Sequence, residues 1–283
     1  MRLNHKILIG INKIKPNKKN FFRIINYHNI QKKYLKNFED QIHFFKDNYN
    51  ILNPNDMHNF FKRKKINGRN ILITFDDGYK SQLDYGINVL EKFNIKSIVF
   101  VIDSFLRSKN ENFNKKFIQN NIAPEFITAS ILNKNNKLYE PSILNEQNLN
   151  IKDINNLIQM KHVIGYHTKN HTNLATLTDK NKLYNEVIDS MSLLSKELND
   201  YKFEHFAYPF GSSINITKNS YDLLKNSYKF IYSGLRGNNY HLSNPILYRD
   251  EISPTYNLKL IKAIINGTAD RLYAFNKFKF RFY

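Results

Sequence analysis

Two residue types are missing from this chain of 283 residues, which contains no cysteine and no tryptophan. Without cysteine it can form no disulfide framework, no thiolate metal cluster and no cysteine nucleophile. Any metal ligands must therefore be histidine, aspartate or glutamate. Long apolar runs are missing as well. No window approaches the roughly 18 residues of a membrane-spanning helix, and the apolar run at 7–11 is too short for a secretory signal. We expect a cytoplasmic protein.

Acidic residues are scarce, with 24 aspartates and glutamates against 43 lysines and arginines, which gives a net charge of +19. This excess favours an anionic partner, and nucleic acid, an anionic membrane surface and a phosphorylated substrate all fit it. The basic residues are spread along the chain and form no known nucleic-acid-binding motif, which makes nucleic acid the least favoured partner. A genome biased toward lysine, asparagine and isoleucine explains the charge equally well. With 41% hydrophobic residues, the chain can build a large packed core.

Short apolar runs alternate with helix-period runs over most of the chain, which is the pattern of a β/α architecture. Apolar residues recur at steps of three and four over 35–45, 83–90 and 183–198. This spacing predicts three helices, the last of them N-capped by Thr178 or Asp179. Seven runs are predicted to be strands: 22–28, 71–75, 97–102, 162–165, 205–208, 228–232 and 246–252.

One long stretch, at 103–150, interrupts this alternation and is rich in asparagine and lysine. We interpret it as an insertion after the third strand, placed where it can cover a site at the carboxyl ends of the strands. The expected organisation is a basic segment at 1–21, a folded domain at 22–267 and a tail at 268–283. Aromatic and basic residues alternate over 275–283. This pattern suits either the surface of an anionic membrane, at its inner face, or a half-buried edge strand.

Two adjacent carboxylates, Asp76 and Asp77, end the second predicted strand and are followed by Gly78. Neighbouring carboxylates repel one another unless a cation or a proton separates them. An Asp-Gly turn with Asp77 as a helix cap is the simpler interpretation. The position of both side chains at the C-terminal end of a buried strand favours a functional site, because parallel β/α folds place their sites there.

A pair of histidines, His167 and His171, follows another predicted strand. On a helical turn this spacing would point both imidazoles to one side. Taken alone, such a pair is more often surface or core histidine than a metal site. Together with Asp77 it makes a set of two histidines and one carboxylate, which leaves positions on a metal open for water and substrate.

A third strand end carries Tyr-Pro-Phe-Gly at 208–211, and with it the sequence resembles the polysaccharide deacetylase family, carbohydrate esterase family four. The resemblance spans 22–252 and rests on Thr-Phe-Asp-Asp-Gly at 74–78, His-Thr-x-x-His at 167–171 and Pro-Phe-Gly at 209–211. Tyr27-His28 is similar to the branch that acts on bacterial surface polysaccharides. The family implies an α/β fold, a distorted (β/α) barrel with about seven strands.

The resemblance also implies roles for the site residues. Asp76 corresponds to the catalytic base, and Asp77, His167 and His171 correspond to the ligands of a divalent metal, which we expect to be Zn²⁺. The backbone N–H of Phe210 corresponds to the donor that stabilises the oxyanion. The implied reaction is hydrolysis of an N-acetyl or other N-acyl group on an amino sugar, in a poly- or oligosaccharide or a lipid-linked sugar.

Departures from the family pattern leave part of the machinery open. Ala207 stands where the family has the arginine that orients the base, and Arg249 is our candidate to replace it. The fourth motif needs a tryptophan, which the chain lacks, and no Leu-x-His near the C-terminus supplies the general acid. His28 and His241 are the candidates for that acid, with a structural role as the alternative for each. These gaps would also fit a non-catalytic, carbohydrate-binding relic of the fold.

Overall fold

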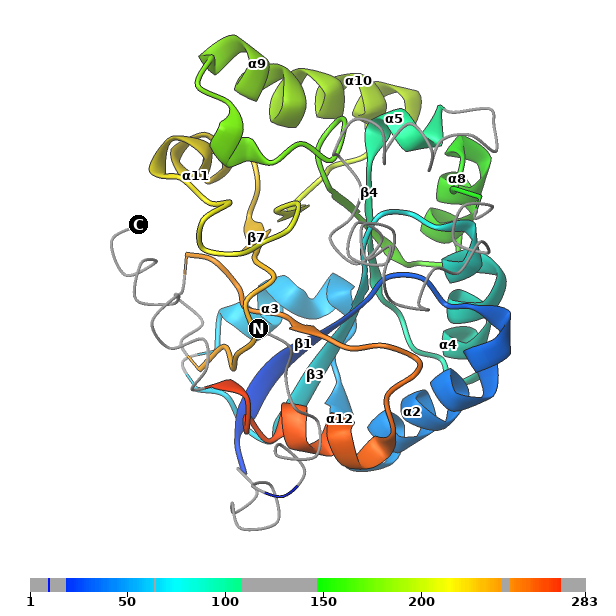
Figure 1. Ribbon diagram of the computed structural model, residues 1–283. Coiled ribbons are helices and arrows are strands. Elements are labelled where there is room, and N and C mark those ends of the chain that lie inside the picture. Colours follow the sequence, from blue (N-terminus) through cyan, green and yellow to red (C-terminus); the bar gives the residue numbers. More distant parts are fainter. Residues whose placement is uncertain (1–9, 11–18, 64, 108–146, 241–244, 271–283) are drawn as a thin grey trace, which may run out of the picture.

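The computed structural model describes residues 10, 19–63, 65–107, 147–240 and 245–270, in which parallel strands alternate with helices (Figure 1). The strands are β1 (Phe21–Tyr27), β2 (Asn50–Ile51), β3 (Arg69–Phe75), β4 (Ile98–Val101), β5 (Val163–Tyr166), β6 (His205–Ala207), β7 (Phe230–Tyr232) and β8 (Asp250–Glu251). The α-helices are α2 (Leu35–Asn48), α3 (Met57–Phe61), α4 (Asn88–Lys92), α5 (Asp103–Leu106), α8 (Ile151–Gln159), α9 (Lys180–Tyr184), α10 (Ser190–Glu197), α11 (Lys218–Leu224) and α12 (Leu258–Ile265).

The strands form one sheet that curls into a distorted barrel. Their order is β7-β6-β5-β4-β3-β1-β8, with β2 beside β3, and every named pair is parallel. Tyr232 on β7 forms a further parallel bridge with Leu247, shortly before β8. The segment 247–251 therefore links both edges of the sheet, and the helices lie around the outside (Figure 1). The predicted α/β fold with a distorted (β/α) barrel is confirmed.

Six of the seven predicted strands are present with each end within two residues of its predicted position, but the last is much shorter than predicted. Only Asp250–Glu251 of the predicted run 246–252 is a strand. The N–H of Tyr248 donates to the Asn239 side chain over 2.8 Å, and the N–H of Arg249 donates to Leu235 O over 3.0 Å. The backbone N–H groups that a longer strand would donate to its neighbour thus donate to a loop instead. The short β2 was not predicted.

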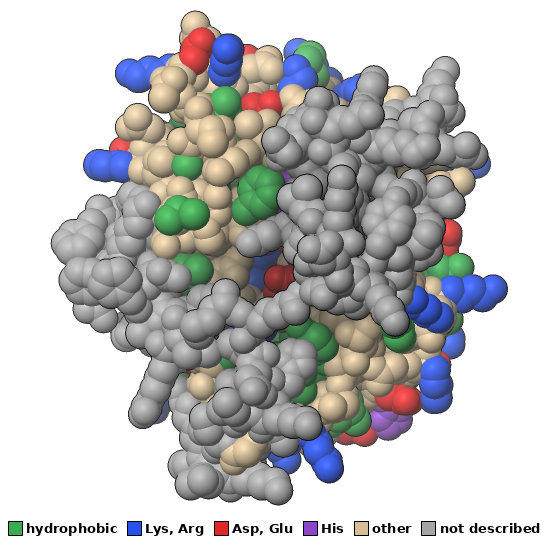
Figure 2. Space-filling model, in the orientation of Figure 1, with side chains coloured by type: hydrophobic (Ala, Val, Ile, Leu, Met, Phe, Trp, Pro, Cys, Tyr) green, Lys and Arg blue, Asp and Glu red, His purple; other side chains and the backbone are tan. Residues whose placement is uncertain are grey.

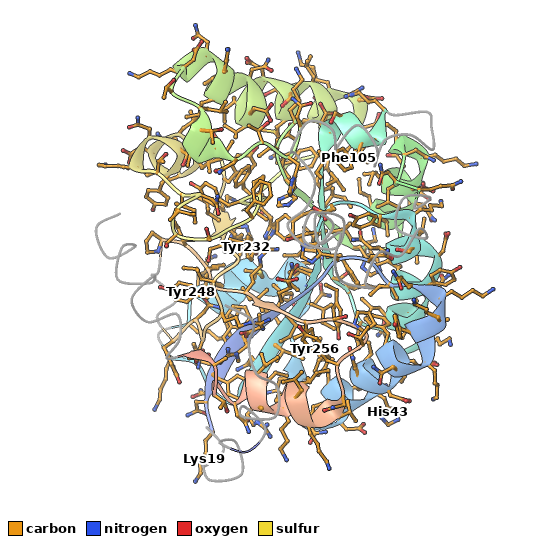
Figure 3. The ribbon with its side chains drawn as sticks, viewed as in Figure 1. Lys19, His43, Phe105, Tyr232, Tyr248 and Tyr256 are labelled. Atoms are coloured by element: carbon orange, nitrogen blue, oxygen red, sulfur yellow. The ribbon has the colours of Figure 1, made fainter. Side chains whose placement is uncertain are left out.

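Alternation of side chains along the strands separates an inner core from an outer one. The outward residues pack against helices; Tyr27, for example, contacts Phe38 of α2 at 5.0 Å between ring centroids. The inward residues fill the lumen of the barrel, where Tyr232 is labelled in Figure 3. The apolar lumen residues include Phe22, Ile24, Leu72, Phe100, Ala207 and Tyr232. Toward the carboxyl ends of β1 and β3 the inward positions become polar, which prepares a site there.

Two predicted helical runs contain a π-helical turn. The run 83–90 spans a π-helical turn, η3 (Gln82–Ile87), and α4. The run 183–198 spans α9, a second π-helical turn, η6 (Asn185–Asp189), and α10. Asp179 rather than Thr178 caps α9, since its side chain accepts hydrogen bonds from two backbone N–H groups of the first turn.

Most of the predicted insertion, at 108–146, lies outside the described residues, as do 1–9, 11–18 and the tail at 271–283. The predicted domain boundaries therefore stay predictions. Where the insertion returns, Lys80 N–H donates to Gln147 O over 2.8 Å, and Tyr79 forms a bridge with Asn148. Both contacts lie just after β3, so the insertion rejoins the barrel beside the two aspartates. No helix of the described segments is long and apolar enough to cross a membrane.

Candidate active site

Asp76 and Asp77 extend from the C-terminal end of β3 into two different environments. The N–H of Asp76 donates to Tyr27 O over 3.0 Å, which continues the parallel pairing with β1. At Asp77 the backbone becomes left-handed, with φ of +75°, and Gly78 follows with φ of +73°. A left-handed conformation costs an aspartate about 1 kcal/mol. The turn lets the two neighbouring carboxylates avoid each other: Asp76 faces the lumen and Asp77 faces the loop after β5.

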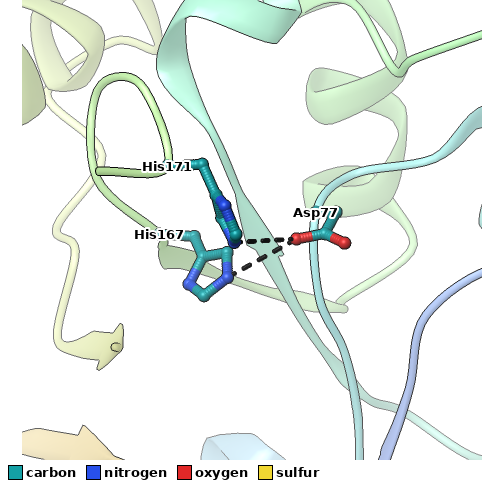
Figure 4. Close-up of side chains that lie close together, drawn as sticks. All are labelled: Asp77, His167 and His171. Atoms are coloured by element: carbon teal, nitrogen blue, oxygen red, sulfur yellow. Dashed lines mark ion pairs between the residues drawn. The ribbon is translucent and has the colours of Figure 1, made fainter. Parts of the chain in front are cut away.

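His167 and His171 reach Asp77 from a loop and not from a helical turn, which corrects the sequence prediction. Thr168 and His171 are left-handed, with φ of +69° and +57°, and this folds the loop back on itself. The Nε2 atoms of both histidines lie 3.5 Å from Asp77 Oδ1 (Figure 4). One ligand atom from each of the three side chains lies within 4.8 Å of the others. The structure therefore brings the predicted triad together.

The three side chains fit a divalent cation. Asp77 is 1% exposed, yet neither carboxylate oxygen has a hydrogen-bond partner among the described residues. A buried carboxylate is costly unless a partner completes it. His167 Nδ1 lies 2.8 Å from Ala207 O, an arrangement that assigns the proton to Nδ1 and leaves Nε2 free to bind a metal. Burial raises the pKa of Asp77, but His167, His28 and His171 together bring it below its usual value. The carboxylate is thus ionised.

Asp76 is held by Arg249 through a buried, two-point ion pair. Arg249 Nη1 lies 2.6 Å from Oδ1 and Nη2 lies 2.8 Å from Oδ2, and Asn26 Nδ2 donates to Oδ2 over 3.0 Å. Burial raises the pKa of Asp76, but the charges of Arg249, His167 and His28 outweigh it and hold the pKa well below its usual range. Asp76 is therefore ionised above about pH 4. The arginine chosen from the sequence contacts the predicted base.

Small residues on β5 and β6 make room for this arginine in the lumen. The guanidinium of Arg249 lies 5.2 Å from the ring centroid of Phe100 and 6.0 Å from that of Tyr232. A Cβ on Gly165 would lie 2.3 Å from the Phe100 ring, so no larger residue fits at that position. Ala207 is fully buried in the same inner core. Ala207 therefore shares the inner core with Phe100 and Tyr232, the two rings nearest the Arg249 guanidinium.

Of the two candidate general acids, His28 lies at the site. Its Nε2 is 3.9 Å from Asp76 Oδ2, and its Nδ1 is 3.9 Å from Glu251 Oε1. The side chain is 20% exposed, so a substrate can reach it. Figure 2 shows a hollow on this face of the molecule with acidic and basic atoms at its floor. His241 lies outside the described residues.

Phe210 sits on a strained turn after β6, with φ of +61°. No described residue accepts a hydrogen bond from its N–H, and its ring packs on His171 at 4.9 Å between centroids. Gly211 follows with φ of +57°, and a Cβ there would lie 2.1 Å from Gly234 N. This close approach of two glycines fixes the turn. A donor that is free, rigid and beside the triad of Asp77, His167 and His171 suits the stabilisation of an oxyanion.

Sequence reasoning missed Asn26 on β1, which bonds to Thr74 on β3, to Asp76 just after β3 and to Arg249 just before β8. Its Oδ1 accepts from Thr74 Oγ1 over 2.7 Å and from Arg249 Nη1 over 3.1 Å, while its Nδ2 donates to Asp76. A signal was available in the sequence. Asn26 and Thr74 are polar at lumen-facing positions of otherwise apolar strands, and a period of two places them on the same face as Asp76.

The chain belongs to the polysaccharide deacetylase family, whose sequence profile matches residues 63–228. It is also similar to solved structures. The deacetylase PplD of Streptococcus pyogenes, in complex with acetate, matches with a TM-score of 0.62 and 17% identity over 88% of this chain and 99% of that one. IcaB from Ammonifex degensii matches with a TM-score of 0.65 and 17% identity over the same shares. At these identities the likeness supports the fold. A search of curated proteins finds no match.

Proposed function

We propose that this protein is a metal-dependent hydrolase that removes the N-acetyl group from an amino sugar of a poly- or oligosaccharide. The observation that carries the proposal is the position of an ionised carboxylate, Asp76, directly beside the triad of Asp77, His167 and His171. Hydrolysis of an amide needs a base for water and a cation for the carbonyl oxygen, and these residues offer both. A de-N-acetylase from Aggregatibacter actinomycetemcomitans shares the fold, with a TM-score of 0.62 and 14% identity over 86% of this chain and 99% of that one.

The triad of Asp77, His167 and His171 would hold a divalent cation, for which we propose Zn²⁺, and this ion would acidify a water molecule and polarise the acyl carbonyl. Asp76 would accept the proton of the attacking water at a carboxylate oxygen, and Arg249 would keep that carboxylate in place. The Phe210 N–H would donate to the oxyanion as it forms. His28 Nε2 would protonate the leaving nitrogen, after which acetate and the free amine separate.

A metal and acetate experiment tests this proposal. We expect protein purified without a histidine tag to bind about one Zn²⁺ per chain and to release acetate from N-acetylglucosamine oligomers. Asp77→Asn and His167→Ala should lose the metal and the activity together, because each removes one of three ligands. His43→Ala is the control, since this side chain is 63% exposed and far from the triad in sequence. Metal content is read by elemental analysis and acetate by an enzyme-coupled assay.

The main competing function is a non-catalytic carbohydrate-binding relic. Ala207 and the missing general acid favour such a relic. Both arguments weaken because Arg249 contacts Asp76 and His28 Nε2 lies 3.9 Å from Asp76 Oδ2. Bound Zn²⁺ and bound sugar without acetate release would favour the relic. An anionic membrane surface as partner and a cytoplasmic location remain proposals, because the basic and aromatic tail lies outside the described residues.

His28→Gln should separate the acid step from the rest of the reaction. The amine of an amide leaves only when protonated, whereas the phenolate of an aryl acetate leaves without a proton. We expect the variant to lose about 100-fold in kcat on N-acetylglucosamine oligomers and to keep most of its activity on 4-nitrophenyl acetate. Equal losses on both substrates, measured at saturating Zn²⁺, would assign the acid to another residue.

A further inference from the structure

Glu186 of η6 binds the loop that carries both histidines. The loop is also contacted by Asn185 of η6, which accepts from Lys169 Nζ over 3.0 Å, and by two backbone N–H groups at the start of α5. The backbone oxygen of Glu186 accepts from Lys169 N–H over 3.0 Å. Its carboxylate accepts twice from Asn170, from the backbone N–H to Oε2 over 3.0 Å and from Nδ2 to Oε1 over 2.6 Å. Three hydrogen bonds thus hold two consecutive loop residues, which lie between His167 and His171.

Glu186 is not placed as an ordinary surface carboxylate. It is 8% exposed, and no described lysine or arginine lies within ion-pair distance of it. It belongs to a π-helical turn, a distortion that disrupts the usual hydrogen-bonding ladder of a helix and is frequent at functional sites. The next turn of the same helix reaches the strand before the loop, where Ser190 Oγ lies 2.5 Å from Tyr166 OH. The distorted helix therefore contacts both the loop, through Glu186, and the strand that precedes it, through Ser190.

The three hydrogen bonds from Glu186 act on a loop with a strained backbone. Thr168 and His171 are left-handed, and each such residue costs about 1 kcal/mol relative to an ordinary conformation. Such residues persist only where their surroundings over-determine them. Asn170 directly precedes His171, so its two bonds to Glu186 fix the chain at the point from which the His171 side chain departs.

We propose that Glu186 is a positioning residue for the metal site, one that holds His171 in place through Asn170. The inference rests on the proposed function, since it concerns the affinity of the same triad for its cation. Glu186 does not touch the triad and has no part in the chemistry. Its effect is to maintain a strained loop whose relaxed form would withdraw one ligand from Asp77.

The test measures Zn²⁺ affinity by competition with a chromophoric chelator. Glu186→Ala should weaken Zn²⁺ binding about tenfold, and Glu186→Gln should weaken it less, because one acceptor oxygen remains. Asp189→Ala is the matched control, since Asp189 is an exposed carboxylate on the same π-helical turn.

Amide hydrogen exchange provides a readout that needs neither metal nor substrate. In the metal-free protein we expect faster exchange at 168–171 in Glu186→Ala and Glu186→Gln than in Asp189→Ala. Unchanged Zn²⁺ affinity in a folded Glu186→Ala protein, or unchanged exchange at 168–171, would overturn this inference and leave the proposed function intact. A wild-type protein that binds no Zn²⁺ would overturn both.

Discussion

Replacement of Asp76 by asparagine is expected to lower kcat for acetate release by about 1,000-fold while Zn²⁺ stays bound. Asparagine has the shape of aspartate, and its oxygen can still accept a hydrogen bond from Arg249. We therefore expect a folded protein of lower stability, because the guanidinium loses its charged partner. The asparagine side chain cannot take a proton from water. The measurement pairs steady-state kinetics on N-acetylglucosamine oligomers with elemental analysis of the same sample.

Asp250→Asn is a closely matched control for this experiment. Asp250 is also a fully buried aspartate bound at two points by an arginine, with Arg23 Nε at 2.6 Å and Nη2 at 2.7 Å. Its substitution should therefore lower stability without a comparable loss of kcat. Retention of wild-type kcat in Asp76→Asn would show that the base is another residue, and His28 would be examined next because it lies 3.9 Å from Asp76.

The second large effect is expected for Arg249→Met, which removes one partner of a buried ion pair. Breaking such a pair from one side typically costs about 3 kcal/mol or more, because the remaining charge is left without compensation. Asp76 would keep only the hydrogen bond from Asn26 among its present donors. Chemical denaturation of the metal-free protein measures the loss of stability. Arg249→Lys keeps the charge but has fewer donors. Its unfolding free energy should therefore lie between those of the wild type and Arg249→Met.

The pH dependence of this stability loss has a defined sign. In the wild type the pKa of Asp76 is lowered, so the group stabilises the fold above about pH 4 and ceases to do so as the pH falls through its lowered pKa. In Arg249→Met, burial raises the pKa and the charged carboxylate destabilises the fold near neutral pH. The difference in unfolding free energy between the two proteins should therefore narrow from about pH 7 to pH 4. A difference that widens on acidification would contradict the pairing.

A second substitution can test whether Arg249 has taken over the role of the missing family arginine. Ala207 and Arg249 both face the inner core beside Phe100 and Tyr232. We expect Ala207→Arg to restore part of the kcat lost in Arg249→Met, because the new guanidinium enters the space that the Arg249 guanidinium no longer fills. In the wild-type background the same change should be harmful. If a folded double variant recovers no activity, an arginine at position 207 cannot replace the one at position 249.

The fold was predictable wherever a strand is buried on both faces, because its apolar run is then continuous and bounded by polar residues. This holds for β1, β3 and β4, whose predicted ends are within two residues of the observed ones. The run at 246–252 looks similar in sequence, yet most of it pairs with the loop that contains Leu235 and Asn239. Contacts of this kind depend on tertiary packing and leave no local pattern.

The site was predictable in its chemistry and less so in its backbone. The residue types at Asp77, His167 and His171 indicated a metal set, but the helical turn expected for the two histidines was wrong. Left-handed conformations at threonine and histidine have no sequence signature, because tertiary contacts such as those of Glu186 impose them. The positions of His241 and of the tail stay predictions.

Arg249 lies beside the same two rings, Phe100 and Tyr232, that share the inner core with Ala207, and this has an evolutionary consequence. An arginine can move between positions 207 and 249 by single substitutions only through a form with two arginines or with none. Each of these forms is expected to have lower activity. The small residues Gly165 and Ala207 also pack in the interior beside Phe100 and Tyr232, and a Cβ at 165 would clash with Phe100. Chains that share this arrangement should therefore form a separate lineage. A search pattern should recognise them by an arginine before the last strand together with alanine or glycine at the vacated position.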